Sequence, residues 1–442
     1  VLHGYQILED RGIIASRPQS GYYVLPRPLS AQKTANLPPM PLEPIRIYSD
    51  FVRDPGDGQR LLAEAMRTDI LQLGAGLPDS SFLPNDPLSL RMSRVVRGQP
   101  DAVNRYALGC GEQSLREAIA KLMLNAGASV TPDDILVTPG ATPALLVALR
   151  AVASPGDAIA LESPGYYGFY AMLRFLGLRA IEIPSDPEHG ISPDEFERAL
   201  SGRVRIRALV ISSAFSNPSG SLLAPVSSQR LVELCRLHNV ALIDDDTYGE
   251  MYHGEARPHP PKSLAPDEVI HIGSFSKILA PGYRIGWIAG GRYQQEIRVC
   301  HSMAVLSVAL PNQLAIATFL ADGGMSRHLR RLRLHYRENL ASIRHCVAAS
   351  FPAGTSVTNP QGGYFLWVRL PDGVRAVDLA ALSIRENISL APGTLFSSRG
   401  NYAGHIRLNG ALPWSDRVEL AIQRLGTLTA GLMSGKHSPT RP

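Results

Sequence analysis

The most informative part of the sequence is the stretch Ser274-Phe275-Ser276-Lys277, continued by Pro281-Gly282-Tyr283-Arg284. A lysine condenses with an aldehyde only in its neutral form, so its site must lower its pKa by burial or by nearby positive charge. The fork of an arginine can bind a phosphate through two parallel hydrogen bonds. The stretch therefore predicts a site for an aldehyde that carries a phosphate. The alternative is a surface lysine and a loop arginine, so the rest of the chain must decide.

The composition is that of an ordinary globular protein. The chain has 442 residues, 45% of them hydrophobic and 19% charged, which is enough for two or three domains. No apolar run approaches the roughly 20 residues that span a bilayer, and the first residues do not form a signal peptide, so we expect a cytoplasmic protein without membrane contact. The four cysteines are scattered and predict neither disulfides nor a zinc site. A net charge of +5 is weak support for nucleic-acid binding.

Helical and strand patterns alternate along the middle of the chain. Helical patterns cover residues 111–125 and 142–152, and short apolar strands are predicted at 135–137, 158–161, 208–211, 240–243 and 269–273. This alternation indicates an α/β fold with a mostly parallel, doubly wound sheet and helices on both faces. From Gly324 to about Ser350 the pattern is a long, Arg-rich amphipathic helix. Strands predicted at 364–368, 388–390 and 405–408 then indicate a smaller α+β domain.

Polar residues follow several of these strands, where an open parallel sheet binds its ligand. Thr138-Pro139-Gly140-Ala141-Thr142 precedes a helix, and free backbone amides at a helix N-terminus attract an anion. Tyr166 offers a flat face for a heteroaromatic ring, and Asn217 offers an amide donor. Each feature alone is an ordinary turn or a core aromatic residue.

Three consecutive carboxylates, Asp244-Asp245-Asp246, end the strand predicted at 240–243. Buried carboxylates are costly unless a cation compensates them. A protonated pyridine nitrogen would be such a cation, and a hydrogen bond to a charged group contributes about 1.5–3 kcal/mol. Tyr248 could then donate to an oxygen on the same ring. Metal binding is the competing interpretation, but no His or Glu stands at a supporting spacing.

As a set, these motifs resemble the class I/II aminotransferase family of fold-type I pyridoxal phosphate enzymes, over roughly residues 69–432. The resemblance rests on the order of Gly76 with Pro78, Tyr106, Gly140, Tyr166, Asn217, Asp245 with Tyr248, Ser274 with Lys277 and Arg284, and Arg407. It implies a large cofactor-binding domain and a smaller C-terminal domain.

The resemblance also implies a role for each residue. Lys277 would hold pyridoxal phosphate as an imine and shuttle a proton, and Asp245 would keep the pyridine nitrogen protonated. Asn217 and Tyr248 would bond the ring hydroxyl, and Tyr166 would stack on the ring. The phosphate would be bound by Gly140, Ala141, Thr142, Ser274, Ser276 and Arg284. Tyr106 would reach the phosphate of the partner subunit, which implies a homodimer, and Arg407 and Gly76 would bind the substrate carboxylate.

The first 25 residues show a second pattern. A helical spacing of Val1, Tyr5 and Leu8 ends at Gly12, and two short strands flank a turn at Ser20-Gly21. The positions of Leu8, Gly12, Gly21 and Val24 resemble the end of the winged-helix domain of GntR regulators. The chain opens inside what would be the recognition helix. We therefore expect DNA binding only if a full winged-helix domain is present.

The predicted order is a winged-helix remnant (1–25), a Pro-rich linker (26–50), an arm and large domain (51–325), a small domain (326–433) and a tail (434–442). This order resembles the MocR subgroup of GntR regulators. The resemblance implies a transcriptional regulator whose aminotransferase-like domain forms an external aldimine with an amino acid or amine. The alternative is a metabolic aminotransferase, because every residue needed for transamination is present. The identity of the amino ligand is not encoded in a recognisable motif.

Overall fold

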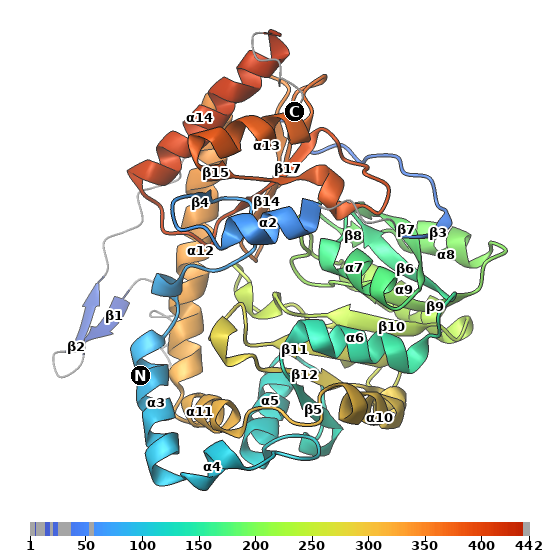
Figure 1. The fold of residues 1–442 in the computed structure, drawn as a ribbon, viewed down its shortest axis with the longest axis vertical. Coiled ribbons are helices and arrows are strands. Elements are labelled where there is room, and N and C mark those ends of the chain that lie inside the picture. Colours follow the sequence, from blue (N-terminus) through green and yellow to red (C-terminus); the bar gives the residue numbers. More distant parts are fainter. Residues whose placement is uncertain (1–4, 6–13, 18–20, 25–36, 53–56, 436–442) are drawn as a thin grey trace.

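The computed structural model describes residues 5, 14–17, 21–24, 37–52 and 57–435, which form two main sheets surrounded by helices (Figure 1). The larger sheet has the strand order β3-β7-β6-β9-β10-β11-β12-β5, and β8 pairs with β7. Its strands are β3 (Ser49–Phe51), β5 (Ile135–Thr138), β6 (Ala158–Ser163), β7 (Arg179–Asp186), β8 (Gly190–Ile191), β9 (Ile206–Ile211), β10 (Ala241–Asp245), β11 (Val269–Ser274) and β12 (Gly286–Ala289).

The centre of this sheet is parallel. β7, β6, β9, β10 and β11 pair in parallel, whereas β12 is antiparallel to both β11 and β5, and β3 is antiparallel to β7. The five strands predicted in this region all exist, with ends within two residues of the prediction. The prediction of a mostly parallel α/β sheet is confirmed.

Helices cover both faces because the strands bury both faces. Along β6, Ile159 and Leu161 join one hydrophobic cluster, whereas Ala158 and Ala160 join another. The first cluster lies under α6 (Ala141–Val152), α7 (Tyr167–Phe175) and α10 (Gln294–Ala304), and the second under α8 (Pro193–Leu200) and α9 (Pro225–Leu237). Successive side chains of a strand point to opposite faces. In β10, Ala241 and Ile243 join the first cluster and Leu242 joins the second, so the residues that follow can be assigned to a face by the same alternation.

A third cluster lies at the β5 end of the sheet. It is formed with α3 (Asn85–Gly98), α5 (Gln113–Asn125), α11 (Leu310–Ala321) and the first half of α12 (Gly324–Ser350). The short α4 (Asp101–Asn104) lies beside α11. The predicted long Arg-rich helix is confirmed, and it runs from this cluster to the second sheet (Figure 1).

The second sheet is antiparallel, with the order β13-β14-β17-β16. Its strands are β13 (Ser356–Val357), β14 (Phe365–Arg369), β16 (Ala391–Pro392) and β17 (His405–Asn409). It packs with α12, α13 (Ala376–Ser383) and α14 (Asp416–Met433) around one core. Beside it, β15 (Ile388–Ser389) pairs in parallel with β4 (Leu71–Gln72), near α2 (Asp57–Ala65).

Short 3-10 helices connect these elements. They are η1 (Ser80–Phe82), η2 (Pro132–Asp134), η3 (Gly249–Met251), η4 (Pro261–Ser263), η5 (Pro281–Tyr283), η6 (Gly291–Tyr293), η7 (Ile384–Glu386) and η8 (Gly393–Phe396). Within the described residues, no helix combines the length and apolar character that crossing a membrane requires.

The N-terminal hairpin is present where the structure describes it. β1 (Ile14–Arg17) pairs antiparallel with β2 (Gly21–Val24), and the ring of Tyr5 stacks on Tyr22 at 4.6 Å. The predicted positions Leu8, Gly12 and Ser20 lie outside the described residues, as do residues 26–36 of the linker and residues 436–442 of the tail. The domain boundaries stay a prediction, and β3 includes the last two residues of the expected linker.

Candidate functional site

The predicted site residues come from one edge of the larger sheet. Gly140 follows β5, Tyr166 follows β6, Asn217 follows β9, Asp245 ends β10, and Lys277 follows β11. Because these strands run in the same direction, their carboxyl ends meet at that edge. The sheet therefore brings together residues that are up to 137 positions apart, from Gly140 to Lys277.

Lys277 lies at the centre of the site. Its Nζ donates a hydrogen bond to the carbonyl oxygen of Gly76 at 2.8 Å. Burial and, to a smaller extent, the positive charges of Arg407 and Arg284 lower the pKa of Lys277 from 10.5 to about 8, against the opposing effect of Asp245. The neutral, nucleophilic amine is therefore available at mildly alkaline pH.

The turn at the N-terminus of α6 has a glycine, Gly140, at its N-cap position. Gly140 has a φ of +98° and no side chain caps the helix there, so the amides of the first turn, at Ala141 and Thr142, point outward without an intrahelical partner. Arg284 lies over this turn, and its Nη2 donates to the carbonyl of Pro139 at 3.0 Å. A Cβ at position 140 would lie 2.5 Å from that Nη2.

Two buried hydroxyls border the same turn. Ser276 Oγ accepts a hydrogen bond from Arg284 Nη1 at 3.1 Å, and Ser274 Oγ accepts one from the amide of Ser276 at 3.1 Å. Arg284 itself has a left-handed backbone, with a φ of +53°, that turns its side chain back toward Gly140. Amides, hydroxyls and a guanidinium around a bare turn are the donors that a phosphate accepts.

Asp245 is buried at the end of β10. Its carboxylate accepts hydrogen bonds from the amide of Thr247 at 3.2 Å and from the hydroxyl of Thr247. The pKa of Asp245 is raised to about 6, mainly by burial and also by the charges of Asp244 and Asp246, while the hydrogen bonds from Thr247 act in the opposite direction. A ring nitrogen that carries a proton would supply the missing opposite charge, so this carboxylate fits a pyridinium.

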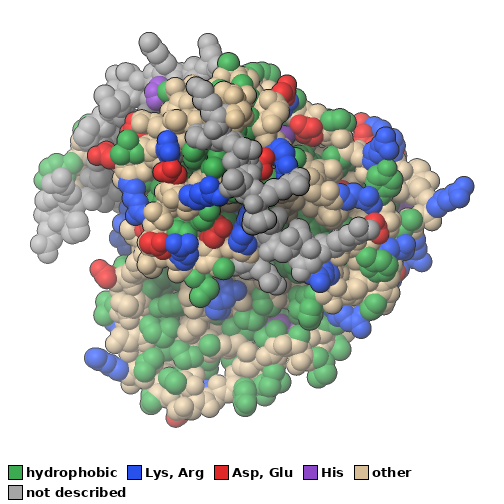
Figure 2. All heavy atoms as spheres, turned by 45° about the horizontal axis from the view of Figure 1, so that its top comes forward, with side chains coloured by type: hydrophobic (Ala, Val, Ile, Leu, Met, Phe, Trp, Pro, Cys, Tyr) green, Lys and Arg blue, Asp and Glu red, His purple; other side chains and the backbone are tan. Residues whose placement is uncertain are grey.

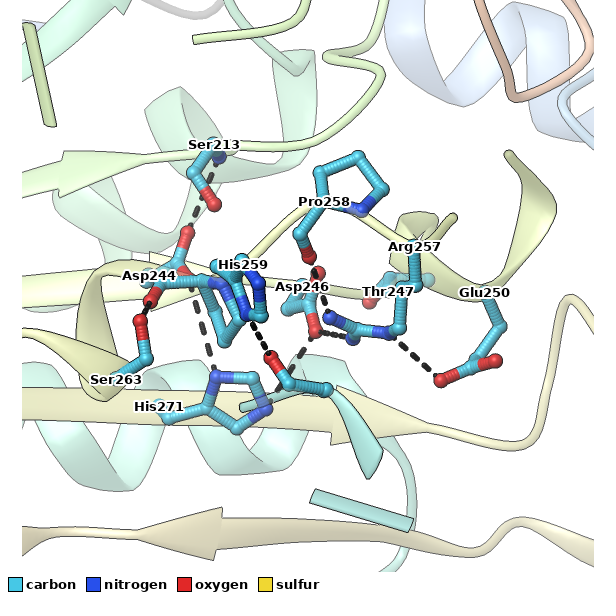
Figure 3. Close-up of polar contacts among 12 residues, drawn as sticks. Ser213, Asp244, Asp246, Thr247, Glu250, Arg257, Pro258, His259, Ser263 and His271 are labelled. Atoms are coloured by element: carbon cyan, nitrogen blue, oxygen red, sulfur yellow. Dashed lines mark hydrogen bonds and ion pairs between the residues drawn. The ribbon is translucent and has the colours of Figure 1, made fainter. Parts of the chain in front are cut away.

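Asp244 and Asp246 face the opposite side of the sheet from Asp245, because strand parity alternates. Figure 3 shows Asp244 and Asp246 with His271 and Arg257. Asp244 accepts a hydrogen bond from the amide of Ser213 at 3.1 Å, and Asp246 pairs with Arg257. His271 of β11 lies between the two carboxylates, with Nδ1 3.8 Å from Asp244 and Nε2 3.7 Å from Asp246.

This back-side group was missed in the sequence, because its partners come from other elements. Arg257 also pairs with Glu250 at 2.7 Å, and Glu250 pairs with Arg333 of α12 at 3.1 Å. Arg333 stacks over Tyr252, at 3.7 Å from its ring centroid. At least one arginine of the Arg-rich helix α12 is therefore held by an ion pair and an aromatic ring. Among the described residues, no three His, Cys, Asp or Glu are grouped to hold a metal ion.

Arg407 of β17 is 1% exposed and lies beside Lys277. Its Nη1 donates to Asn217 Oδ1 at 2.7 Å, and its Nη2 donates to the carbonyl of Gly74 at 2.5 Å. Its guanidinium contacts two aromatic rings, with Cζ 4.4 Å from the ring centroid of Phe365 and 5.0 Å from that of Phe396. Burial lowers its pKa, and Nε is buried without a hydrogen-bond partner among the described residues. An anionic ligand would satisfy this cation.

Several tyrosines line the space around Arg407. The ring of Tyr248 lies 5.6 Å from that of Tyr364, and the hydroxyl of Tyr364 donates to the carbonyl of Gly76 at 3.2 Å. Burial raises the pKa of Tyr166, Tyr248 and Tyr364, so all three carry their hydroxyl protons at neutral pH. Tyr364 was not predicted, and its place after Gly362-Gly363 was the only signal in the sequence.

One predicted residue lies apart from the others. Tyr106 is 72% exposed in the loop after α4 and makes no hydrogen bond or ring contact in the described part of the chain. The remaining predicted residues surround one position, with phosphate donors on one side, the carboxylate of Asp245 on another, and Lys277 and Arg407 between them. They fit a phosphate-bearing aldehyde whose ring nitrogen is cationic.

Comparisons with known proteins agree with this geometry. Residues 68–425 match the family described as "Aminotransferase class I and II". The HTH-type transcriptional regulator YjiR of Escherichia coli is 37% identical over 434 residues, covering 96% of this chain and 89% of YjiR. The HTH-type transcriptional regulator YdcR of the same organism is 34% identical over 429 residues, covering 97% and 90%.

A solved structure is similar over the same region. It is that of LysN, an alpha-aminoadipate aminotransferase from Thermus thermophilus, complexed with N-(5'-phosphopyridoxyl)-L-leucine. The two chains superpose with a TM-score of 0.79 at 29% sequence identity, covering 87% of this chain and 96% of LysN.

Proposed function

Because the chain belongs to the class I and II aminotransferase family, with its fold-type I architecture, we propose that it is the cofactor-binding, ligand-sensing part of a MocR-type transcriptional regulator. The observation that carries this proposal is the gathering of Lys277, Asp245, Arg284 and Arg407 at one sheet edge. The two regulators named above match over nearly the whole chain, which favours regulation over metabolism.

The cofactor is pyridoxal phosphate, which when bound supplies a ring that takes up the electron pair left at the carbon beside the amine. We assign its phosphate to the turn at Gly140, Ala141 and Thr142, together with Ser274, Ser276 and Arg284. The carboxylate of Asp245 would face the ring nitrogen, the ring of Tyr166 would cover one face, and Tyr248 and Asn217 would donate to the ring hydroxyl oxygen. Lys277 would hold the aldehyde covalently.

Arg407 is the residue that we assign to the carboxylate of an amino acid. Its guanidinium is held in one plane by Phe365 and Phe396, so its fork is preorganised for two parallel hydrogen bonds. Gly76 adds its backbone amide from the other side, and a Cβ there would crowd Phe365 at 3.1 Å. Once released, Lys277 Nζ can accept and return a proton at the carbon beside the ligand amine.

A homodimer is part of this proposal, and it gives the exposed Tyr106 a role. We propose that this exposed tyrosine reaches the phosphate in the partner subunit. Figure 2 shows hydrophobic side chains gathering on the lower half of the molecule. Large exposed hydrophobic side chains of α3, α4, α10 and the loops beside them support a buried interface there: Leu90, Val96, Val103, Tyr106, Leu108, Val299, Met303 and Leu306.

The linker is attached to the ligand site by packing. Met40 and Ile45 pack against a cluster that contains Phe396, the ring that stacks on Arg407. Leu37 packs on the core of the second sheet, and Ile47 on that of the larger sheet. A ligand that moves Arg407 can therefore change the contacts of the segment that leads to the hairpin.

The test measures spectrum and DNA binding on one preparation of the full-length protein loaded with pyridoxal phosphate. We expect that amino acids from a panel change the cofactor absorbance, and that the same compounds change the affinity for DNA from upstream of its own gene, measured by fluorescence anisotropy. Lys277→Ala should abolish both responses, whereas Lys121→Ala, an exposed lysine, should keep them. A DNA affinity that is independent of every active compound would refute regulation.

The second candidate is a metabolic aminotransferase, and the complete set of Lys277, Asp245 and Arg407 supports it. A single-turnover experiment with the loaded protein distinguishes the two. Conversion of the bound cofactor to pyridoxamine phosphate by one amino acid, reversed by a 2-oxo acid, would establish transamination. If no member of the panel produces this conversion, the metabolic function is refuted.

A further inference from the structure

Another buried carboxylate, that of Glu182, lies close to the site and has no role in the chemistry described above. Glu182 of β7 is 5% exposed. It accepts hydrogen bonds from Ser163 Oγ at 2.7 Å, from Ser397 Oγ at 3.0 Å, and from both the amide and the hydroxyl of Ser398 at 2.6 Å. Its donors come from β6 and from the segment 397–398, which follows η8.

Glu182 is held by hydrogen bonds alone. Among the ion pairs of the described residues, none joins Glu182 to a Lys, Arg or His side chain, although most buried carboxylates in proteins are paired. Burying a charge costs free energy unless hydrogen bonds replace its hydration. The donors from three serines meet that requirement, and they do so by joining a loop of the second sheet to two strands of the larger sheet.

Other contacts fasten the same loop at its two ends. The carbonyl of Phe396 accepts hydrogen bonds from the amide of Gly165 at 3.0 Å and from the hydroxyl of Tyr170 at 3.3 Å. At the far end, the hydroxyl of Tyr402 lies 3.2 Å from Ser163 Oγ, which also bonds Glu182. Segment 396–402 is thus bound along the edge of the larger sheet, with Glu182 at its centre.

This loop carries Phe396, one of the two aromatic residues that contact Arg407, the residue assigned to the ligand carboxylate. The ring centroid of Phe396 lies 5.0 Å from Cζ of Arg407, and that of Phe365 lies 4.4 Å from the same atom. Phe396 is held in turn by edge contacts with Trp367 at 5.3 Å and Tyr167 at 6.2 Å. If the loop moves, the guanidinium loses its flat support on one side, and a fork that is free to tilt binds a carboxylate less well.

We propose that Glu182 is a positioning residue for the ligand carboxylate: it holds segment 396–402 against the larger sheet, so that Phe396 keeps the plane of Arg407. This role deepens the proposed function and rests on it. Glu182 touches neither the cofactor nor the amino ligand. Because Glu182 acts through Phe396 on Arg407, its effect is confined to ligands that carry a carboxylate.

The test compares two amines that differ only in the carboxylate, L-norvaline and n-butylamine. Both are titrated into the full-length protein loaded with pyridoxal phosphate and followed by the cofactor absorbance. In Glu182→Gln, one acceptor oxygen becomes an amide donor that faces serine hydroxyls. We expect the dissociation constant of L-norvaline to rise about tenfold, a change of about 1.4 kcal/mol. The constant of n-butylamine should stay within about twofold, since it makes no bond to Arg407.

The control is Glu233→Gln, which changes a surface carboxylate that is 47% exposed and should leave both constants unchanged. A second readout is amide hydrogen exchange, which should accelerate in segment 396–402 of Glu182→Gln and stay constant in β10. If Glu182→Gln does not fold, Ser398→Ala provides the same comparison, because it removes only one donor to Glu182.

The outcomes separate the inference from the proposed function. A wild-type protein that responds to neither amine would refute the proposed function itself. When the wild type responds, an equal rise in the dissociation constants of L-norvaline and n-butylamine in Glu182→Gln would refute the positioning role. Unchanged exchange in segment 396–402 would refute it as well.

Discussion

At the scale of single residues, a low pKa does not by itself identify the reactive lysine. Burial lowers the pKa of both Lys262 and Lys277 to about 8. Lys262 Nζ, however, donates to the carbonyls of Pro266 and Val269 and closes a loop. Lys277 makes one hydrogen bond, to the carbonyl of Gly76, at the edge where Asp245 and Arg407 converge. Its surroundings, and not its acidity alone, distinguish Lys277 as the proposed nucleophile.

The depressed pKa of Lys277 predicts how cofactor uptake depends on pH. Only the neutral amine attacks the aldehyde, so the rate of uptake by the protein without cofactor should rise with pH and level off above about 8. Stopped-flow absorbance after mixing with pyridoxal phosphate measures this rate. The amine of Nα-acetyllysine has an ordinary pKa, so its rate of reaction with pyridoxal phosphate should keep rising with pH until about pH 10.5. A protein profile that follows the free amine would show that the site does not perturb Lys277.

At the scale of elements, β10 uses its two faces for different purposes. Asp245 points toward the site, and Asp244 and Asp246 point toward Arg257 and His271. The alternation lets one strand end in three carboxylates, because the back-side pair finds its cation and donors in other elements. Asp245 thereby remains without an ion-pair partner among the described residues, as the proposed contact with a ring nitrogen requires.

Removing the back-side cation should destabilise the protein strongly. Arg257→Ala leaves Asp246 buried without its partner, and breaking a buried ion pair in this way costs about 3–5 kcal/mol of unfolding free energy. Urea unfolding at neutral pH measures the loss. Arg230→Ala is the matched control, since Arg230 and Glu197 are 44% and 46% exposed and such a pair contributes about 1 kcal/mol or less. If both variants lose the same unfolding free energy, burial does not make the Arg257–Asp246 pair more important than a surface pair.

The turn before α6 should tolerate no side chain. Gly140→Ala places a Cβ 2.5 Å from Arg284 Nη2 on a backbone with a φ of +98°, so it should displace the guanidinium and disturb the amides of the first turn. We expect the dissociation constant of pyridoxal phosphate to rise at least about tenfold. Gly282→Ala, which meets no atom within 4 Å, should bind normally. Equal affinities of the two variants would place the phosphate elsewhere.

At the scale of the whole molecule, the site lies where the two sheets meet. The larger sheet supplies Lys277, Asp245 and Asn217, and the second sheet supplies Arg407 with its aromatic walls. Asn217 and Arg407 bond directly across this junction at 2.7 Å. A site built this way responds to any shift of one sheet against the other, as a ligand sensor requires.

The dimer proposal predicts complementation between two inactive variants. Lys277→Ala lacks the covalent attachment, and Tyr106→Ala should bind the cofactor weakly because its partner's phosphate site loses a hydroxyl. A mixed dimer contains one site with Lys277 from one subunit and Tyr106 from the other. Random reassociation of an equimolar mixture makes about half of the dimers mixed, so tight binding should return at about a quarter of all sites. Absorbance of the mixture measures this. No gain over the separate variants would refute the exchange of Tyr106.

The order of elements was predictable because it is local. The apolar runs of β6, β9, β10 and β11 are set by neighbouring residues, and the turn before α6 needs only its glycine. The resemblance of the ordered motifs also predicted which residues converge, from Gly140 to Arg407. These conclusions hold without coordinates, because hydrophobic periodicity and backbone freedom belong to the chain itself.

The partners of buried charges were decided only by the tertiary structure. Nothing near Asp246 in the sequence points to His271, and nothing near Glu182 points to Ser397 and Ser398. Desolvation acts on whichever groups the packed elements bring within a few ångströms, and that set depends on register and on how the two sheets meet. For the same reason, the plane of Arg407 and the lowered pKa of Lys277 exist only in the folded molecule.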